Sequence, residues 1–495
     1  MNHLTDSVKM RYPIKYTFNL CYENVKGRTT KRENQGGCKM EQQNSKAELF
    51  ESRPIPKAVA ELAIPMMVSS LVMVIYNLAD TFFVGMLNDP VQNAAVTLVY
   101  PVMLAFNAVN NLFGVGTSSM MSRSLGRGDY ETVRTSSAFG FYGAVFSGLL
   151  FTFCCTVMKN PLLGLLGADS STWDATASYM FWTVTCGAVP AILNVVQGQM
   201  VRSEGAAIHA SVGTMSGCIL NIILDPFFIL PWGLNMGAAG AGLATFLSNC
   251  VACIYFLVLT RVQRGKTFIS LDIRKLKNLN KSTVLSILGV GIPASIQNLL
   301  NVTGTTILNN FTAVYGASAV AAMGVAQKIN MLPIQIEMGF SQGIMPLVSY
   351  NYASGNRKRM KDCILFALKV SIPIMLAITV FYWFAAPSLI QLFMKNADIV
   401  AYGSAFLRGM CLGMTLMCID FTAVGVFASL GFGRYSLLFA ILRKIVLEIP
   451  LLFLLNMIFP LYGLAYAQFG AEFILSIVAI FMLLRIFRQD APPKK

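Results

Sequence analysis

ELAIPMMVSSLVMVIYNLADTFFVG occupies residues 61–85, and it carries no charged side chain between Glu61 and Asp80. A helix of about 20 apolar residues crosses a hydrocarbon core about 30 Å thick. The proline inside it, Pro65, is compatible with such a helix, because neighbouring groups in a membrane bundle satisfy the backbone carbonyl that proline frees. The stretch therefore predicts a transmembrane helix.

Apolar spans of this kind recur along the whole chain. Of its 495 residues, 55% are hydrophobic and 12% are charged, whereas a soluble domain has about 25% charged residues. The predicted fold is therefore an all-α integral membrane protein with twelve transmembrane helices in the lipid bilayer. The expected spans are 58–83, 93–120, 135–158, 177–199, 206–231, 238–260, 284–311, 317–347, 363–386, 402–429, 435–458 and 462–486.

The basic residues outside these spans gather on one side of the predicted topology. A net charge of +15 suggests a nucleic-acid partner, but the basic residues are spread over loops that alternating helices bring to one membrane face. Such a bias marks the cytoplasmic side. We therefore expect an inner-membrane protein with both termini in the cytoplasm and no nucleic-acid partner. The basic side holds Lys57, Arg127, Arg202, Arg261, Lys275, Arg357 and Arg488, among others, and the opposite side holds Lys159, Lys395 and Arg408.

The first 57 residues are expected to form a cytoplasmic tail, and 489–495 a second one. Residues 1–39 are polar and basic without an apolar run, so they do not predict a signal peptide. Two interpretations stay open for them: a disordered tail, or a segment that precedes the true start at Met40.

A weak internal repeat divides the chain into two lobes. At an offset of about 227 residues, Gly116 and Ser122 are echoed by Gly343 and Ser349. An even number of helices in each copy makes the repeats parallel, a common plan in transporters. The sequence predicts an N-lobe at 58–260, a basic linker at 261–283 and a C-lobe at 284–488, each lobe with six helices.

Ionisable residues inside the spans are the candidates for function, because a charge in the hydrocarbon region costs at least about 2.5–3.5 kcal/mol. Asp80 and Asp225 are expected roughly 8 Å below the outer ends of their helices, at 1.5 Å per residue. Asn221 lies one helical turn from Asp225, and Thr245 reaches a similar depth. Their oxygens suit a hard cation such as Na⁺ or a carried proton. The alternative is structural, with these groups serving as helix caps or as hydrogen bonds between helices.

Other motifs exclude several classes of protein. There is no GxxxxGK[ST] phosphate loop, and the chain has only His3 and His209, so an ATP-driven pump, a metalloprotease and a Ser-His-Asp hydrolase are not expected. We expect a non-enzyme without a cofactor and with no metal except Na⁺ as a coupling ion. The remaining ionisable candidates inside the predicted spans are Lys328, Glu337, Asp420, Arg443, Lys444, Glu448 and Glu472.

Five motifs together resemble the multidrug and toxic compound extrusion (MATE) family over about 58–488, and especially its multidrug exporter branch. They are ELAIPMMVSSLVMVIYNLADTFFVG (61–85), NLFGVGTSSMMSRSLGRGD (111–129), LNIILDPFFIL (220–230), GAAGAGLATFLSN (237–249) and PLVSYNYASGN (346–356). The resemblance implies two six-helix lobes and export of organic cations in exchange for inward H⁺ or Na⁺.

The resemblance also implies roles for particular residues. Asp80, Asn221, Asp225 and Thr245 match the coupling site of the N-lobe, and Pro65 matches a point where the first helix bends. In the C-lobe, Asp420 matches an acidic position, whereas Asn301 stands where relatives have an acidic residue. We expect Asp420, Asn301 and Glu337 to form a substrate or second cation site, and the protein to act as a monomer on cationic amphiphilic molecules. The alternative function is a flippase for a lipid-linked precursor.

Overall fold

The computed structural model of the chain describes residues 48–87, 89–394 and 396–488. Most of these residues form helices, and there is no strand among them. The predicted tails at 1–39 and 489–495 lie outside the described residues. The all-α fold class is therefore confirmed.

The first half of the described chain runs from α3 to α11. Its helices are α3 (Ile55–Gly85), α4 (Pro90–Asn110), α5 (Gly116–Gly126), α6 (Tyr130–Val157), α7 (Lys159–Leu165), α8 (Trp173–Met180), α9 (Ala188–Ser203), α10 (Ala207–Ile229) and α11 (Ala238–Val262). Two short π-helical turns, η1 (Asn111–Val115) and η2 (Phe181–Cys186), join α4 to α5 and α8 to α9, and a 3-10 turn, η3 (Ile273–Asn278), follows α11.

The second half runs from α12 to α19. Its helices are α12 (Lys281–Ala313), α13 (Ala317–Ala353), α14 (Arg357–Gln391), α15 (Ala397–Cys411), α16 (Met414–Leu430), α17 (Gly433–Ile441), α18 (Ile449–Ile458) and α19 (Gly463–Arg488). A π-helical turn, η4 (Leu442–Glu448), joins α17 to α18.

Eight of the described helical stretches are long and apolar enough to cross a membrane. Two further stretches, α8–η2–α9 and α15–α16, are each bent by more than 40°, and the number rises to ten if each of them counts as one span. Two further long stretches, α13 and α17–η4–α18, coincide with the remaining predicted spans but contain more polar and charged residues. The chain is thus a multi-pass membrane protein with eight to ten apolar spans among the described residues, and the count of twelve stays a prediction.

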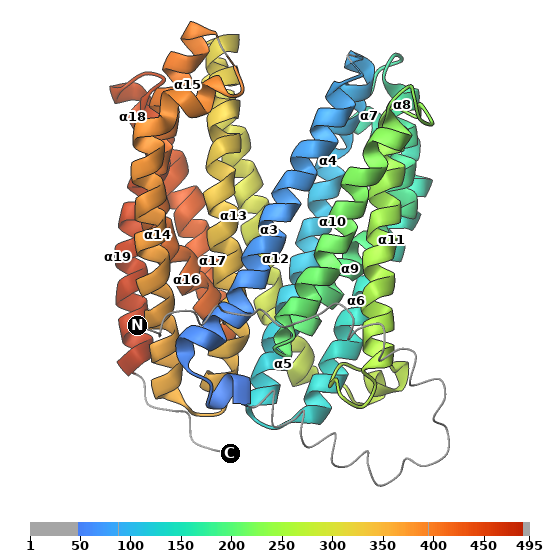
Figure 1. Cartoon of the computed structure of the whole chain (residues 1–495), viewed down its shortest axis with the longest axis vertical. Coiled ribbons are helices and arrows are strands. Elements are labelled where there is room, and N and C mark those ends of the chain that lie inside the picture. Colours follow the sequence, from blue (N-terminus) through green and yellow to red (C-terminus); the bar gives the residue numbers. More distant parts are fainter. Residues whose placement is uncertain (1–47, 88, 395, 489–495) are drawn as a thin grey trace, which may run out of the picture. The chain divides into compact units, whose positions relative to one another are not determined.

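The two halves meet along α3 and α12. Helix α3 packs on α10 of its own half and on α13 of the second half, while α12 packs on α17 of its own half and on η1 and α5 of the first. In Figure 1, α3 and α12 lie between the group α4–α11 and the group α13–α19. We call the end of the bundle where α3 begins and α19 ends the basic end, since Arg127, Arg357 and Arg488 lie there.

Contacts in the two halves repeat at the predicted offset. A Cβ atom at Gly116 would lie 2.5 Å from the Ile287 backbone oxygen of α12, and one at Gly343 would lie 2.6 Å from Ala63 Cα of α3. Because only glycine permits this approach, each half pairs closely with the first helix of the other. Likewise, Ser122 Oγ donates to the Ser203 carbonyl at 3.1 Å, and Ser349 Oγ donates to the Ser429 carbonyl at 2.8 Å.

The segments expected to be a tail and a linker pack on the bundle. Phe50 is 2% exposed and stacks on Tyr350 with 4.7 Å between ring centroids. Its carbonyl accepts a hydrogen bond from Asn351 Nδ2 at 3.1 Å. In the linker, Phe268 and Ile269 are buried against the first half. Apolar side chains in these short basic segments are the physical reason for their packing.

Pro65 lies inside α3, which continues through it as one helix from Ile55 to Gly85. Proline lacks the N–H that would bond the Glu61 carbonyl, so it weakens α3 locally. The predicted role of Pro65 in bending remains a prediction.

Candidate functional site

The packing of α3 on α10 brings Asp80 and Asp225 together. Asp225 is fully buried, Asp80 is partly buried, and the two carboxylates are close enough to interact electrostatically. Each lies within about five residues of the end of its helix away from the basic end. The two carboxylates thus lie near the same end of the bundle, opposite the basic end, and their depth in the membrane stays a prediction.

Asn221 and Thr245 lie beside Asp225 and are 1% and 6% exposed. Asn221 Nδ2 lies 3.4 Å from Thr245 Oγ1. With the amide turned over, Asn221 donates to Asp225 Oδ2 at 3.1 Å and accepts from the Thr245 backbone N–H at 3.1 Å, which satisfies both ends of the amide. The structure thus brings all four residues predicted for the N-lobe into one cluster, which we call the carboxylate pair site.

Two tyrosines complete this site, and the sequence analysis did not identify them. Tyr76 interacts with the side chain of Thr245 and with the charges of Asp80 and Asp225. Tyr179 of α8, which is 5% exposed, interacts with the same two carboxylates. Tyr76 lies four residues before Asp80 on α3, so helical spacing was a usable signal for it. No local signal in the sequence places Tyr179 there.

The carboxylate pair site has no basic partner among the described residues. Neither Asp80 nor Asp225 forms an ion pair there, and each leaves Oδ1 without a hydrogen-bond partner. Two neighbouring carboxylates repel each other unless a proton or a cation lies with them. Carboxylate, amide and hydroxyl oxygens are ligands that hard cations accept. Chemically, the site can therefore hold a proton or a small hard cation.

The buried carboxylates of the second half are paired instead. Arg443 Nη1 lies 3.2 Å from Asp420 Oδ2, and Arg443 Nη2 forms an ion pair with Glu472. These three side chains are at most 5% exposed. Arg443 also lies over the ring of Phe421, 4.9 Å from its centroid. The π-helical turn η4 places Arg443 and its neighbour Lys444 in the bundle, where Lys444 Nζ lies 2.6 Å from Glu448 Oε2.

The residues predicted for a C-lobe site do not form one cluster. Asp420 is held by Arg443, whereas Asn301 is exposed on α12 and its side chain makes no hydrogen bond within the described part of the chain. Glu337 is buried on α13 beside Cys418, with Oε1 unpartnered among the described atoms. Lys328 is exposed. A second cation site built from Asp420, Asn301 and Glu337 therefore remains a prediction without a shared geometry.

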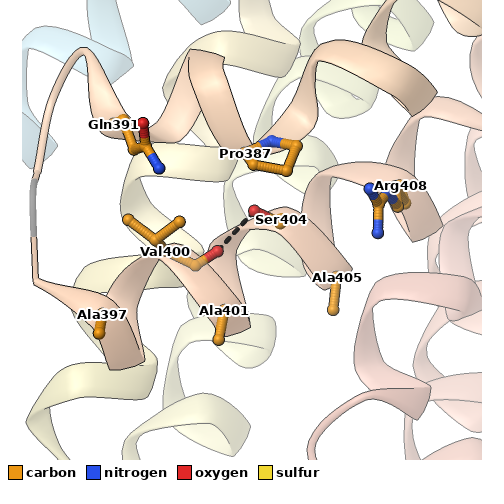
Figure 2. Close-up of a pocket in the computed structure, with 8 residues that line it drawn as sticks. All are labelled: Pro387, Gln391, Ala397, Val400, Ala401, Ser404, Ala405 and Arg408. Atoms are coloured by element: carbon orange, nitrogen blue, oxygen red, sulfur yellow. Dashed lines mark hydrogen bonds between the residues drawn. The ribbon is translucent and has the colours of Figure 1, made fainter.

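An open pocket of about 510 Å³ lies between the end of α14 and α15 (Figure 2). Pro387 and Gln391 line it from α14, and Val400, Ser404 and Arg408 are among the lining residues of α15. Ser404 Oγ donates to the Val400 carbonyl at 2.5 Å. The charged lining residue is Arg408, so the pocket is not suited to a cation and contains none of the predicted site residues.

The chain is similar to known transport proteins. It matches the MatE family over residues 65–227 and 293–454. It is 32% identical over 435 residues to the multidrug export protein MepA of Staphylococcus aureus (strain MSSA476), and the aligned region covers 88% of this chain and 94% of that protein. MepA of Staphylococcus haemolyticus (strain JCSC1435) is 33% identical over 437 residues, with 88% and 94% covered. A solved outward-facing multidrug resistance MATE family transporter of the MOP superfamily has a TM-score of 0.84 and 27% identity, covering 89% of this chain and 97% of that one.

Proposed function

Because this chain belongs to the MATE family of membrane transporters, we propose that it exports cationic amphiphilic small molecules, drugs among them, in exchange for an inward-moving proton or Na⁺. Its relatives are named multidrug export proteins, which are transporters and not enzymes. The basic end faces the cytoplasm in this proposal, since basic loops mark that side. The protein acts as a monomer in the inner membrane.

The observation that carries the proposal is the unpaired state of the carboxylate pair site. Asp80 and Asp225 lie together without a basic partner among the described residues, whereas Asp420 and Glu472 share the single positive charge of Arg443. An exchangeable cation or proton is more readily taken up by the unpaired carboxylates, because no tethered cation competes for them. The first half is therefore the proposed location of ion coupling.

Coupling requires that the ion and the substrate prefer different states of the transporter. A ligand shifts an equilibrium only by its difference in affinity between the two states. In the proposal, a proton or Na⁺ entering from the outer side binds Asp80 and Asp225 and favours the state that releases the substrate outward. By linkage, substrate bound from the cytoplasm favours release of the ion inward.

The test is export by purified protein in lipid vesicles. A fluorescent organic cation is followed under a proton gradient and, separately, under a Na⁺ gradient. We expect one of the gradients to drive transport in the wild type, and Asp80→Asn or Asp225→Asn to lower the rate to the level without a gradient, because the amide cannot carry a charge or exchange a proton. Full gradient-driven transport by both variants would contradict the proposal.

Asp169 provides a matched control away from the carboxylate pair site, in the loop before α8. Hydrogen bonds from Ser171 and Thr172 lower the pKa of Asp169 to about 2, so this carboxylate stays ionised at working pH. The substitution Asp169→Asn removes the charge but keeps an oxygen that can accept the same hydrogen bonds. It should therefore leave gradient-driven export unchanged in the same vesicles.

The alternative function, a flippase for a lipid-linked precursor, needs basic side chains that are free to bind pyrophosphate. Arg443 is bound by Asp420 and Glu472, and Lys444 is bound by Glu448. These pairs occupy two of the three basic residues considered for that role, which weighs against the alternative, while the third, Lys328, is exposed and forms no ion pair among the described residues. A vesicle that flips a labelled lipid pyrophosphate but exports no organic cation would favour it.

A further inference from the structure

A small polar chamber lies between the two halves near the basic end. It is lined by serines of α5, by Gln199 and Arg202 near the end of α9, and by Gln342 and Ser349 of α13. The chamber has a volume of about 10 Å³, which is enough for one water molecule or an ion of similar size. Helices α5 and α9 belong to the first half and α13 to the second, so the chamber is formed by both halves together.

Arg202 is the charged residue of this lining, and it is 5% exposed. Its Nη1 atom donates to Gln199 Oε1 at 2.9 Å, while its Nε–H has no acceptor in the described structure. Arg202 forms no ion pair with any carboxylate of the described residues. A guanidinium group remains charged in proteins, and a buried charge without a partner is strongly destabilising.

A second buried arginine adjoins the chamber. Arg123 follows the lining residue Ser122 and is 9% exposed. Its Nε–H donates to the Ser119 carbonyl at 3.2 Å, and its Nη2 group has no described acceptor. It reaches the second half, since a Cβ atom added at Gly431 would contact its guanidinium group. Arg123, like Arg202, lacks an ion pair among the described residues, so two positive charges are buried here without a directly paired carboxylate.

Helix ends compensate for only part of this charge. Arg123 and Arg202 lie in the last turns of α5 and α9, where the helix dipole favours a cation. That effect is smaller than the cost of burying an unpaired charge. The remaining penalty is removed if a negative ion occupies the chamber.

We propose that the chamber binds one small inorganic anion of chloride size, which bridges the two halves while they are closed at the basic end. Arg202 lines it from the first half, with an Nε–H that has no acceptor among the described atoms. Gln342 faces it from the second half, and only its Oε1 atom is used in the described hydrogen bonds, at 3.4 Å from Gln199 Nε2. The anion loses half of its ligands when the halves separate, so it stabilises the closed arrangement.

The first test measures binding and does not depend on transport. Purified protein is melted in sodium chloride or sodium gluconate at equal ionic strength, and crystals are soaked in sodium bromide. We expect a saturable rise of the melting temperature with chloride and an anomalous bromide peak beside Arg202 Nε. Removing a hydrogen bond to a charged group costs about 1.5–3 kcal/mol, so Arg202→Gln should raise the half-saturating chloride concentration by roughly tenfold or more.

Two further variants keep the proposal testable if Arg202→Gln does not fold. Gln342→Glu adds a tethered negative charge to the chamber, so it should melt higher than the wild type in gluconate and respond little to chloride. Arg261→Gln removes an exposed arginine at the same end and should respond as the wild type does. An equal chloride response in the wild type and Gln342→Glu, or a bromide soak with only water in the chamber, would overturn the proposal.

Discussion

At the scale of single residues, the two halves differ in how they neutralise buried carboxyl groups. Asp80 and Asp225 are surrounded by the neutral polar side chains of Asn221, Thr245, Tyr76 and Tyr179, and of these Asn221 donates a hydrogen bond to Asp225. Asp420 and Glu472 have Arg443 between them. Arg443 is a cation that is covalently fixed to the chain, whereas a site of neutral oxygens and carboxylates can bind and release a free cation. The same residue type can therefore serve exchange in one half and structure in the other.

Replacing Arg443 tests the structural role of the second cluster. Arg443→Met leaves Asp420 and Glu472 buried without their cation, and breaking a buried ion pair in this way costs about 3–5 kcal/mol. We expect a marked fall in the melting temperature of the purified protein. Arg434→Met, which removes an exposed arginine of α17, should change it little. Equal melting of both variants would show that the cluster does not stabilise the fold.

At the scale of elements, glycines set how closely helices of different halves approach. Gly343 of α13 lies so near α3 that an added Cβ would be 2.6 Å from Ala63 Cα and 3.1 Å from the Leu62 carbonyl oxygen. These are backbone atoms, which cannot rotate away. The close contact of α13 with α3 therefore depends on the absence of a side chain at this position.

Gly343→Ala should push α13 and α3 apart. Overpacking of this kind costs about 1–3 kcal/mol, so thermal melting of the purified variant should occur at a lower temperature. Gly324 is the control on the same helix, because a Cβ there meets nothing within 4 Å. Gly324→Ala should keep or slightly raise the melting temperature, since alanine favours helices over glycine. The reverse order of stability would contradict this account of the α3–α13 contact.

At the scale of the whole described bundle, contacts between the halves concentrate near the basic end. Ser119 Oγ donates to the Ala428 carbonyl at 2.5 Å, Tyr350 donates to Glu51 Oε1 at 2.6 Å, and Gln199 reaches Gln342. A transporter that takes up substrate from the cytoplasm must break these contacts in each cycle, because they close that side in the proposed orientation.

Cross-linking tests this requirement. In a background without the eleven native cysteines, Gln199→Cys and Gln342→Cys are joined by a short thiol-reactive linker. We expect the linker to block export and its reductive cleavage to restore it. Asn194→Cys with Asn249→Cys joins an equivalent amide pair, 2.7 Å apart, within the first half, and its cross-link should leave export intact. Export through a linked Gln199–Gln342 pair would exclude opening at this end.

The sequence by itself determined the membrane-spanning helices, the parallel repeat and the shared face of Asn221 and Asp225. Apolar length and helical period are local properties, so they can be read without knowing which helices touch. Only the tertiary structure decided that Arg443 lies between Asp420 and Glu472, that Tyr179 joins Asp80 and Asp225, that Asn301 is exposed, and that Phe50 packs on Tyr350. These contacts join residues far apart in the chain, and helix packing, not neighbouring sequence, brings them together.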